Sequence, residues 1–499
     1  MASIKVPKFL NIAVFCGAWS FIIIYLWVAF HRMPFPFELE WIEGGMVDQV
    51  QRIVHGESVY VPPGIRFVPF LYPPLYFYLS AGASFLLGPG LFPLRLVSFL
   101  ASLVSLLTIF LIVCDETGDW RVGMLSAGFF AATFRLAGAW LDIARVDSLF
   151  LALWLLFIYL IRDHKSLVRA ALAGALVALV FLTKQLALVL CLPVIAYLFW
   201  RSWKYALTLL LVAIGLVGLT TLVFDRLSAG WYSYYIFGLL FGQTEWQLSQ
   251  FVLFFGNDLL LHLPLAIFFC LSFFVVSFRQ DTVLPTIFKW LSIFAGALAG
   301  AFIARMKVGG YDNVLLPAYA AIAILFGLGL HRFSMMAGQL PLVYKYRVQA
   351  MLSIACLIQL AILGYNPYEQ IPTASDLKAG NDLIRFISSV DGEVYLPDHG
   401  YLPALAGKKT YAHHSTIWDV VRADQQNPAS EMLKQELKRA ISQQVFSLII
   451  LDSEWNYCCQ QIDGFYTRAG KVFQEEQVFY PVTGWARRPS IIFLPKRLQ

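Results

Sequence analysis

Residues 9–30, FLNIAVFCGAWSFIIIYLWVAF, form an apolar segment long enough to span a bilayer, and this segment decides the class of fold. Two lysines precede it and no small-residue cleavage site follows it, so we interpret it as a retained signal-anchor helix. Soon afterwards comes FELEWIEGG, residues 37–45, with the three glutamates Glu38, Glu40 and Glu43. They are either solvated loop residues or carboxylates that act on a substrate at the membrane edge.

The composition extends this interpretation to the whole chain. Of its 499 residues, 59% are hydrophobic and only 14% are charged, whereas soluble domains carry roughly 25% charged residues. The mean hydropathy is +0.67. These values predict a polytopic, all-α membrane domain with about eleven transmembrane helices. The apolar runs lie at 9–30, 94–114, 121–140, 148–161, 168–183, 185–200, 205–224, 259–278, 286–304, 314–330 and 348–365.

The distribution of Lys and Arg in the short loops predicts how these helices are oriented. With eleven helices, the basic clusters, such as Arg201 with Lys204, fall on one side, which we assign to the cytoplasm. The loops 31–93, 141–147 and 305–313 and everything after about residue 366 then lie outside. The stretch 73–88 is short and is expected to form an interfacial or half-inserted helix. We therefore expect a multi-pass protein of the plasma (inner) membrane.

Residues 366–499 have ordinary polarity and predict a small extracytoplasmic α/β domain that follows the membrane domain, residues 1–365. Helical periodicity occurs in DLIRFISSV (382–390) and EMLKQELKRAISQQV (431–445). Strand patterns occur in EVYLP (393–397), FSLIILD (446–452) and SIIFLPK (490–496). The excess positive charge belongs to the membrane part, so it does not indicate a nucleic-acid partner.

Ionisable residues gather on the predicted outer face, several of them within a turn of a membrane helix. Such groups are costly at that depth unless they line a cavity or a pathway. Lys184, between two spanning runs, adds to an excess of outer cations that a bound lipid phosphate would explain. The acidic clusters around Glu40 and Asp147 supply carboxylates for general-base chemistry on a hydroxyl.

The cysteines and histidines give little indication of a metal. No CxxC spacing or Cys/His zinc pattern occurs. His399, His413 and His414 are expected to be solvated or hydrogen-bonded. No cofactor is therefore firmly implied, and a divalent metal stays open.

Four stretches resemble the GT-C glycosyltransferases, in particular family 39 and its ArnT-like members. WIEGGMVDQVQRIVHGESVY (41–60) resembles their first outer loop, with an acidic residue, an amphipathic stretch, a Gly and a Tyr. FLYPPLYFYLSA (70–81) is similar to the Pro-Pro-Leu segment that follows, and ARVDSLFLALWLLF (144–157) to the end of the second outer loop. ARMKVGGYDNVLLPAY (304–319) resembles a further outer loop and helix start. The resemblance covers about residues 1–365.

The resemblance implies an inverting enzyme that uses a polyprenyl-phosphate-linked sugar and a glycan, lipid or protein acceptor. In the family, the first-loop acid is the catalytic base. Spacing to Gly56 assigns this position to Glu43, but Ile42 replaces the first acid of the family's Asp-Glu pair, so Glu40 remains a rival. Asp147 matches the second-loop acid. The candidates for binding phosphate or substrate are Arg145, Lys184, Arg305, Lys307, Tyr72 and Asn313.

Two other functions are compatible with parts of the sequence. A transporter or flippase of a lipid-linked saccharide would also need cations near a lipid phosphate, but transporters often show repeats and ionisable groups near mid-membrane. A non-catalytic scaffold that presents the C-terminal domain would leave the outer charge clusters unexplained. We therefore favour the glycosyltransferase.

Overall fold

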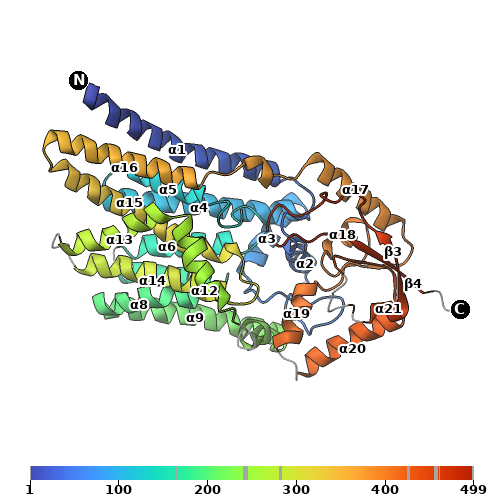
Figure 1. The fold of residues 1–499 in the computed structure, drawn as a ribbon. Helices are drawn as coiled ribbons and strands as arrows, with labels where there is room; N and C mark the ends of the chain where they lie inside the picture. Colours follow the sequence, from blue (N-terminus) through green and yellow to red (C-terminus); the bar gives the residue numbers. More distant parts are fainter. Residues whose placement is uncertain are drawn as a thin grey trace.

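The computed structural model describes residues 2–162, 166–239, 246–279, 284–423, 427–453, 459 and 461–496. In Figure 1 the long helices lie side by side at one end of the molecule. The small sheet and helices α17 to α21 lie at the other end, next to α2 and α3. Of the predicted 366–499 domain, residues 424–426, 454–458, 460 and 497–499 lie outside the described residues.

Five helical stretches among the described residues are long and apolar enough to cross a membrane. They are residues Lys8–Arg32 of α1 (Ala2–Arg32), α4 (Leu91–Thr117), α9 (Trp203–Ser228), α14 (Leu284–Met306) and Asp312–Gly338, which joins η3 (Asp312–Leu315) to α15 (Leu316–Gly338). Two bent pairs raise the number to as many as seven: Ser249–Leu261 with Pro264–Phe278, and Leu342–Ile362 with Pro367–Ser389. These pairs contain α12 (Ser249–Leu253), η2 (Phe254–Leu261), α13 (Pro264–Arg279), α16 (Leu342–Ile362) and η4 (Pro367–Gln370).

The predicted count of eleven membrane helices is not confirmed, because several of the apolar runs form shorter helices. These are α5 (Trp120–Ala132), α6 (Asp147–Leu160), α7 (Leu167–Phe181) and α8 (Ala187–Arg201), whereas spanning takes about 20 residues. Within the run 121–140 the α-helix reaches only Ala132, and Gly138 and Ala139 near the end of the run have positive φ, which an α-helix does not allow. The stretch 73–88 does form a helix, α3 (Leu75–Leu87).

Small residues bring the helices of the bundle close together. A Cβ built on Gly174 of α7 would lie 2.4 Å from the Leu209 carbonyl oxygen of α9, and one on Gly296 of α14 would lie 2.4 Å from the Leu190 carbonyl oxygen of α8. Such close backbone approaches are typical of helices that pack within a bilayer. Large apolar side chains on the outside, such as Leu211 and Leu219 of α9, are well exposed and suit contact with lipid.

The C-terminal region contains one four-stranded sheet in the order β1-β2-β4-β3. β1 (Glu393–Tyr395) pairs in parallel with β2 (Phe446–Leu451), and β4 (Ile491–Pro495) runs antiparallel to both β2 and β3 (Tyr466–Lys471). The three predicted strands and two predicted helices are confirmed. The helices of this region are α17 (Ala374–Ser389), α18 (Tyr401–Leu405), α19 (His414–Ala423), α20 (Pro428–Ser442) and α21 (Ile462–Phe465).

The first connection after α1 lies between the helix bundle and the C-terminal region. The Phe37 ring packs so closely on α17 that a Cβ on Gly380 would overlap it. The Thr483 amide donates to the Leu39 carbonyl at 3.1 Å. This connection leads into α2 (Glu43–Val54) and carries the three glutamates. The remaining short helices, α10 (Trp231–Ser233) and η1 (Tyr234–Gly238), follow α9.

Candidate active site

A cavity of about 730 Å³ opens where the helix bundle meets the C-terminal region. The bundle side contributes residues from loops at the ends of helices: Glu40, Trp41, Ile42, Tyr72, Trp140, Arg145, Lys184, Lys307, Tyr311 and Asn313. The C-terminal region contributes residues from α19 and from the segment before β4: His414, Ser415, Trp418, Asp419, Arg422, Gly484, Trp485, Ala486 and Arg487. Segments that are far apart in sequence therefore line the same cavity.

Glu40 is the carboxylate of the first connection that lines this cavity. Its Oε2 accepts a hydrogen bond from Arg145 Nη1 at 2.7 Å and one from the Ile42 amide at 3.2 Å. Only 1% of the residue is exposed. Burial raises the pKa of Glu40 to about 7, although the Arg145 charge opposes the shift. A carboxylate with such a pKa is suited to taking a proton near neutral pH.

Arg145 links Glu40 to the aromatic wall of the cavity. Its Nη2 donates to the Tyr72 hydroxyl at 3.0 Å, and its guanidinium lies 5.4 Å from the centre of the Trp140 ring. The buried Nε has no hydrogen-bond partner among the described residues. An unsatisfied buried donor is costly unless a ligand or water completes it, so Arg145 has capacity for a ligand that accepts hydrogen bonds.

Asp147 does not line the cavity but accepts hydrogen bonds from three residues that do. Its Oδ1 accepts from Lys184 Nζ at 2.7 Å and from Asn313 Nδ2 at 3.0 Å, and its Oδ2 accepts from Trp140 Nε1 at 3.1 Å. The acid matched to the second outer loop is thus a positioning group in this geometry. It orients Lys184 and Asn313, both predicted from the sequence as substrate-binding residues.

Glu43 lies apart from the cavity, in a fully buried ion pair. Arg95 donates to both of its carboxylate oxygens, at 3.0 and 2.6 Å, and the amides of Leu39 and Ala144 each donate at 2.6 Å. Burial alone would raise the pKa of Glu43, but the Arg95 charge and these hydrogen bonds lower it below its usual value. With its lone pairs filled, Glu43 is poorly placed to accept a proton, so the geometry favours Glu40, the rival that the sequence left open.

The four predicted phosphate-binding cations do not all reach the cavity. Arg145, Lys184 and Lys307 line it. Arg305 does not, because Asp258 binds it at 2.8 and 3.1 Å and Asp312 at 3.0 Å. Arg305 thus lies next to the cavity, paired with two carboxylates, and is not one of its lining residues.

The nine of the 24 lining residues that belong to the C-terminal region were not predicted from the sequence as site residues. They come from HHSTIWDVVR (413–422) and GWARR (484–488), where Trp and Arg stand within a few residues of one another. Aromatic rings next to cations and hydrogen-bonding groups are typical of polar-ligand sites, so this composition was the available signal. Only the fold shows that both segments face Glu40.

A second buried cluster anchors the first connection to the C-terminal region. His399 Nδ1 bonds to Glu38, and its Nε2 lies 3.1 Å from Asp452 Oδ2. Burial alone would lower the pKa of His399, but the two carboxylates raise it well above its usual value. The expectation that the histidines would be hydrogen-bonded is met here. Within the described ranges no three His, Cys, Asp or Glu side chains are arranged to hold a metal ion.

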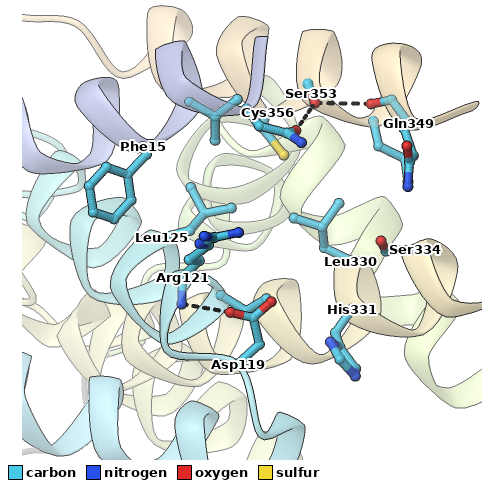
Figure 2. Close-up of a pocket in the computed structure, with 14 residues that line it drawn as sticks. Phe15, Asp119, Arg121, Leu125, Leu330, His331, Ser334, Gln349, Ser353 and Cys356 are labelled. Atoms are coloured by element: carbon cyan, nitrogen blue, oxygen red, sulfur yellow. Dashed lines mark hydrogen bonds between the residues drawn. The ribbon is translucent and has the colours of Figure 1, made fainter. Parts of the chain in front are cut away.

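Another cavity, of about 220 Å³, lies near the opposite end of the bundle (Figure 2). Its polar groups already serve the local structure: Asp119 accepts from the Arg121 amide as the N-cap of α5, and Ser353 bonds to Asn11 and to the Gln349 carbonyl. It lacks a buried carboxylate paired with cations. The first cavity is therefore the candidate active site.

Comparison with known proteins agrees with this architecture. The chain is similar to ArnT from Cupriavidus metallidurans bound to undecaprenyl phosphate, with a TM-score of 0.59 and 12% identity over 95% of this chain and 97% of that one. It is also similar to the archaeal oligosaccharyltransferase AglB from Archaeoglobus fulgidus in complex with an inhibitory peptide and a dolichol-phosphate, with a TM-score of 0.54 and 12% identity over 98% and 76%. No curated protein matches the chain significantly.

The chain therefore shares its overall fold with ArnT and AglB, including a bundle of membrane-length helices. More particularly, residues 72–224 match the family model described as dolichyl-phosphate-mannose-protein mannosyltransferase. The resemblance inferred from the sequence motifs is thereby confirmed.

Proposed function

We propose that this protein is an inverting glycosyltransferase that moves a sugar from a polyprenyl-phosphate donor to an acceptor hydroxyl on the extracytoplasmic face. The observation that carries the proposal is the cavity in which the buried Glu40 carboxylate lies among cations. The lipid phosphates bound to ArnT and AglB support it, because both proteins share the fold.

The ion pairs around the cavity support one position for the donor phosphate. Lys184 is neutralised by Asp147. Lys307 lies within ion-pair distance of no carboxylate among the residues that the structure describes. Burial and the nearby Arg422 charge both lower the pKa of Lys307. An anion between Lys307 and Arg422 would relieve this repulsion, so we assign the phosphate to these two cations.

The chemical step then needs one base. Glu40 takes the proton of the acceptor hydroxyl while the hydroxyl oxygen attacks the anomeric carbon from the side opposite the phosphate. The bond between the anomeric carbon and the phosphate oxygen breaks, and the phosphate leaves with the bonding electrons. The cations stabilise its added negative charge, so no strong general acid is required.

The position of the cavity favours transfer over transport. A transporter typically places its ionisable groups near the middle of the membrane, in broken helices. Here the ionisable groups lie at the ends of helices and against the C-terminal region.

The test is the Glu40→Gln variant, which keeps the shape of the side chain and removes the base. We expect the transfer rate to fall by about 10²–10⁴, while undecaprenyl phosphate still binds. The rate is measured as release of undecaprenyl phosphate from a panel of undecaprenyl-phosphate-linked hexoses and pentoses incubated with cell-envelope membranes. Glu57→Gln is the matched control, because this glutamate is 54% exposed and lies outside the cavity. Near-normal transfer by Glu40→Gln would remove Glu40 from the mechanism.

A further inference from the structure

The segment 483–487 of the C-terminal region rests directly on the proposed base. Thr483 is fixed by the hydrogen bond from its amide to the Leu39 carbonyl. Gly484 has φ of +77°, and a Cβ built on it would lie 2.7 Å from Cγ of Glu40. The backbone therefore approaches Glu40 more closely than any other residue type would allow. A ligand bound by residues 483–487 would therefore lie close to the Glu40 carboxylate.

Three tryptophans stand around this point of contact. Trp41 and Trp485 meet edge to face, with ring centres 6.0 Å apart, and Trp418 lines the same cavity. Trp485 remains 56% exposed, although the Arg487 guanidinium lies 3.6 Å from its ring centre. A large aromatic surface inside a cavity is a binding surface for a ligand with an apolar face.

The polar groups beside these rings restrict the class of ligand. Arg487 and Asp419 line the cavity next to the tryptophans, and their side chains offer hydrogen-bond donors and acceptors. An acyl chain would remove water from these charged groups and form no hydrogen bond with them, which is costly. A pyranose ring has one face of C–H groups and a rim of hydroxyls, so it satisfies an aromatic surface and a polar rim together.

We infer that the tryptophan wall is the acceptor subsite and that it takes a saccharide, with a pyranose ring stacked on Trp485 and an acceptor hydroxyl directed at Glu40. This inference rests on the proposed function and adds the substrate class. The donor phosphate lies at Lys307 and Arg422, so donor and acceptor approach Glu40 from different parts of one cavity.

The inference is tested by saturation-transfer NMR on the full-length protein in detergent, with methyl glucoside, galactoside and mannoside as probes. We expect ring C–H protons of at least one glycoside to receive saturation from the wild type. Trp485→Ala should weaken this binding about tenfold, as expected for the loss of a stacked aromatic ring. Trp485→Phe should restore most of it. Trp203→Ala is the matched control, because Trp203 is 60% exposed and lies outside the cavity.

Several outcomes would overturn the inference. No glycoside signal with the wild type, or equal signals with the wild type and Trp485→Ala, rejects the saccharide subsite. Trp485-dependent binding of a serine-containing peptide instead would assign the wall to a protein acceptor. Glu40→Gln should keep glycoside binding, so loss of the proposed base and loss of the acceptor subsite give different results.

Discussion

Glu40 and Glu43 are three residues apart and equally buried, yet their surroundings give them opposite proton affinities. Glu40 has one arginine and one amide as partners, while Glu43 has an arginine on both oxygens and two amides. At Glu40 the effect of burial is larger and the pKa is raised. At Glu43 the effect of the ion pair and hydrogen bonds is larger and the pKa is lowered. The first residue is suited to exchange protons and the second to hold the connection in place.

This difference predicts that Glu43→Gln affects stability more than chemistry. The variant leaves the buried Arg95 charge without its counter-ion, which costs on the order of 3–5 kcal/mol. We expect a clearly lower midpoint of thermal unfolding in detergent. Glu40→Gln also removes the counter-ion of a buried arginine, but it should lower the midpoint less, because Arg145 lines the open cavity and still lies near the Asp147 carboxylate. A stable but inactive Glu43→Gln variant would return the base to Glu43.

The sequence could identify these acids but could not rank them. Spacing to Gly56 favoured Glu43. Spacing carries no information about which residues bind each carboxylate in the folded protein, so it could not rank the two acids. Arg95 is 52 residues further on and inside α4, where nothing in the local pattern marks it as a partner.

At the scale of elements, the strands that bury most of their side chains were predictable and the exposed one was not. β2 and β4 read as apolar runs, whereas β3, YTRAGK, buries only Tyr466 deeply and looks like a loop. The bundle shows a related limit: the apolar run 121–140 marked a helix but not its length, because the helix ends at Ala132 while the apolar pattern continues.

The contact between the first connection and α18 depends on pH through His399. Its imidazolium lies between Glu38 and Asp452. Because the pKa of His399 is raised in the folded state, its stabilisation is fully present below about pH 6.5, the unfolded value. The stabilisation is lost as pH rises through the folded-state pKa.

We therefore expect His399→Gln to lower the unfolding midpoint at pH 6 and to flatten the loss of stability at alkaline pH. Thermal unfolding between pH 6 and pH 10 measures both effects. His55→Gln, a change at the exposed histidine that follows α2, is the control. Equal midpoints for His399→Gln and the wild type at pH 6 would show that this cluster does not anchor the region.

At the scale of the whole molecule, the resemblance covered only the helix bundle, and so it could predict only that side of the cavity. Tyr72, Arg145, Lys184, Lys307 and Asn313 were identified and do line it. Trp418 and Trp485 were missed, because closeness to Glu40 arises from packing between distant parts of the chain.

The proposed orientation makes a direct prediction for the whole chain. Alkaline phosphatase fused after residue 380 should be active, because residue 380 is predicted to lie outside the cytoplasm. A green fluorescent protein fused at the same position should not fluoresce. A fusion after residue 204, in a predicted cytoplasmic loop, should give the reverse. Fluorescence from the first fusion would show that the predicted topology is inverted and that the cavity lies on the cytoplasmic side.

The contact of Gly484 with Glu40 also has a consequence for biosynthesis. The ribosome makes Glu40 before almost every helix of the bundle and Gly484 after all of them. Trp418 and Trp485 are therefore missing from every nascent chain whose helices are still being inserted. If the proposed function holds, a partly made chain could not transfer sugar, because the residues that complete the cavity are translated only after the bundle.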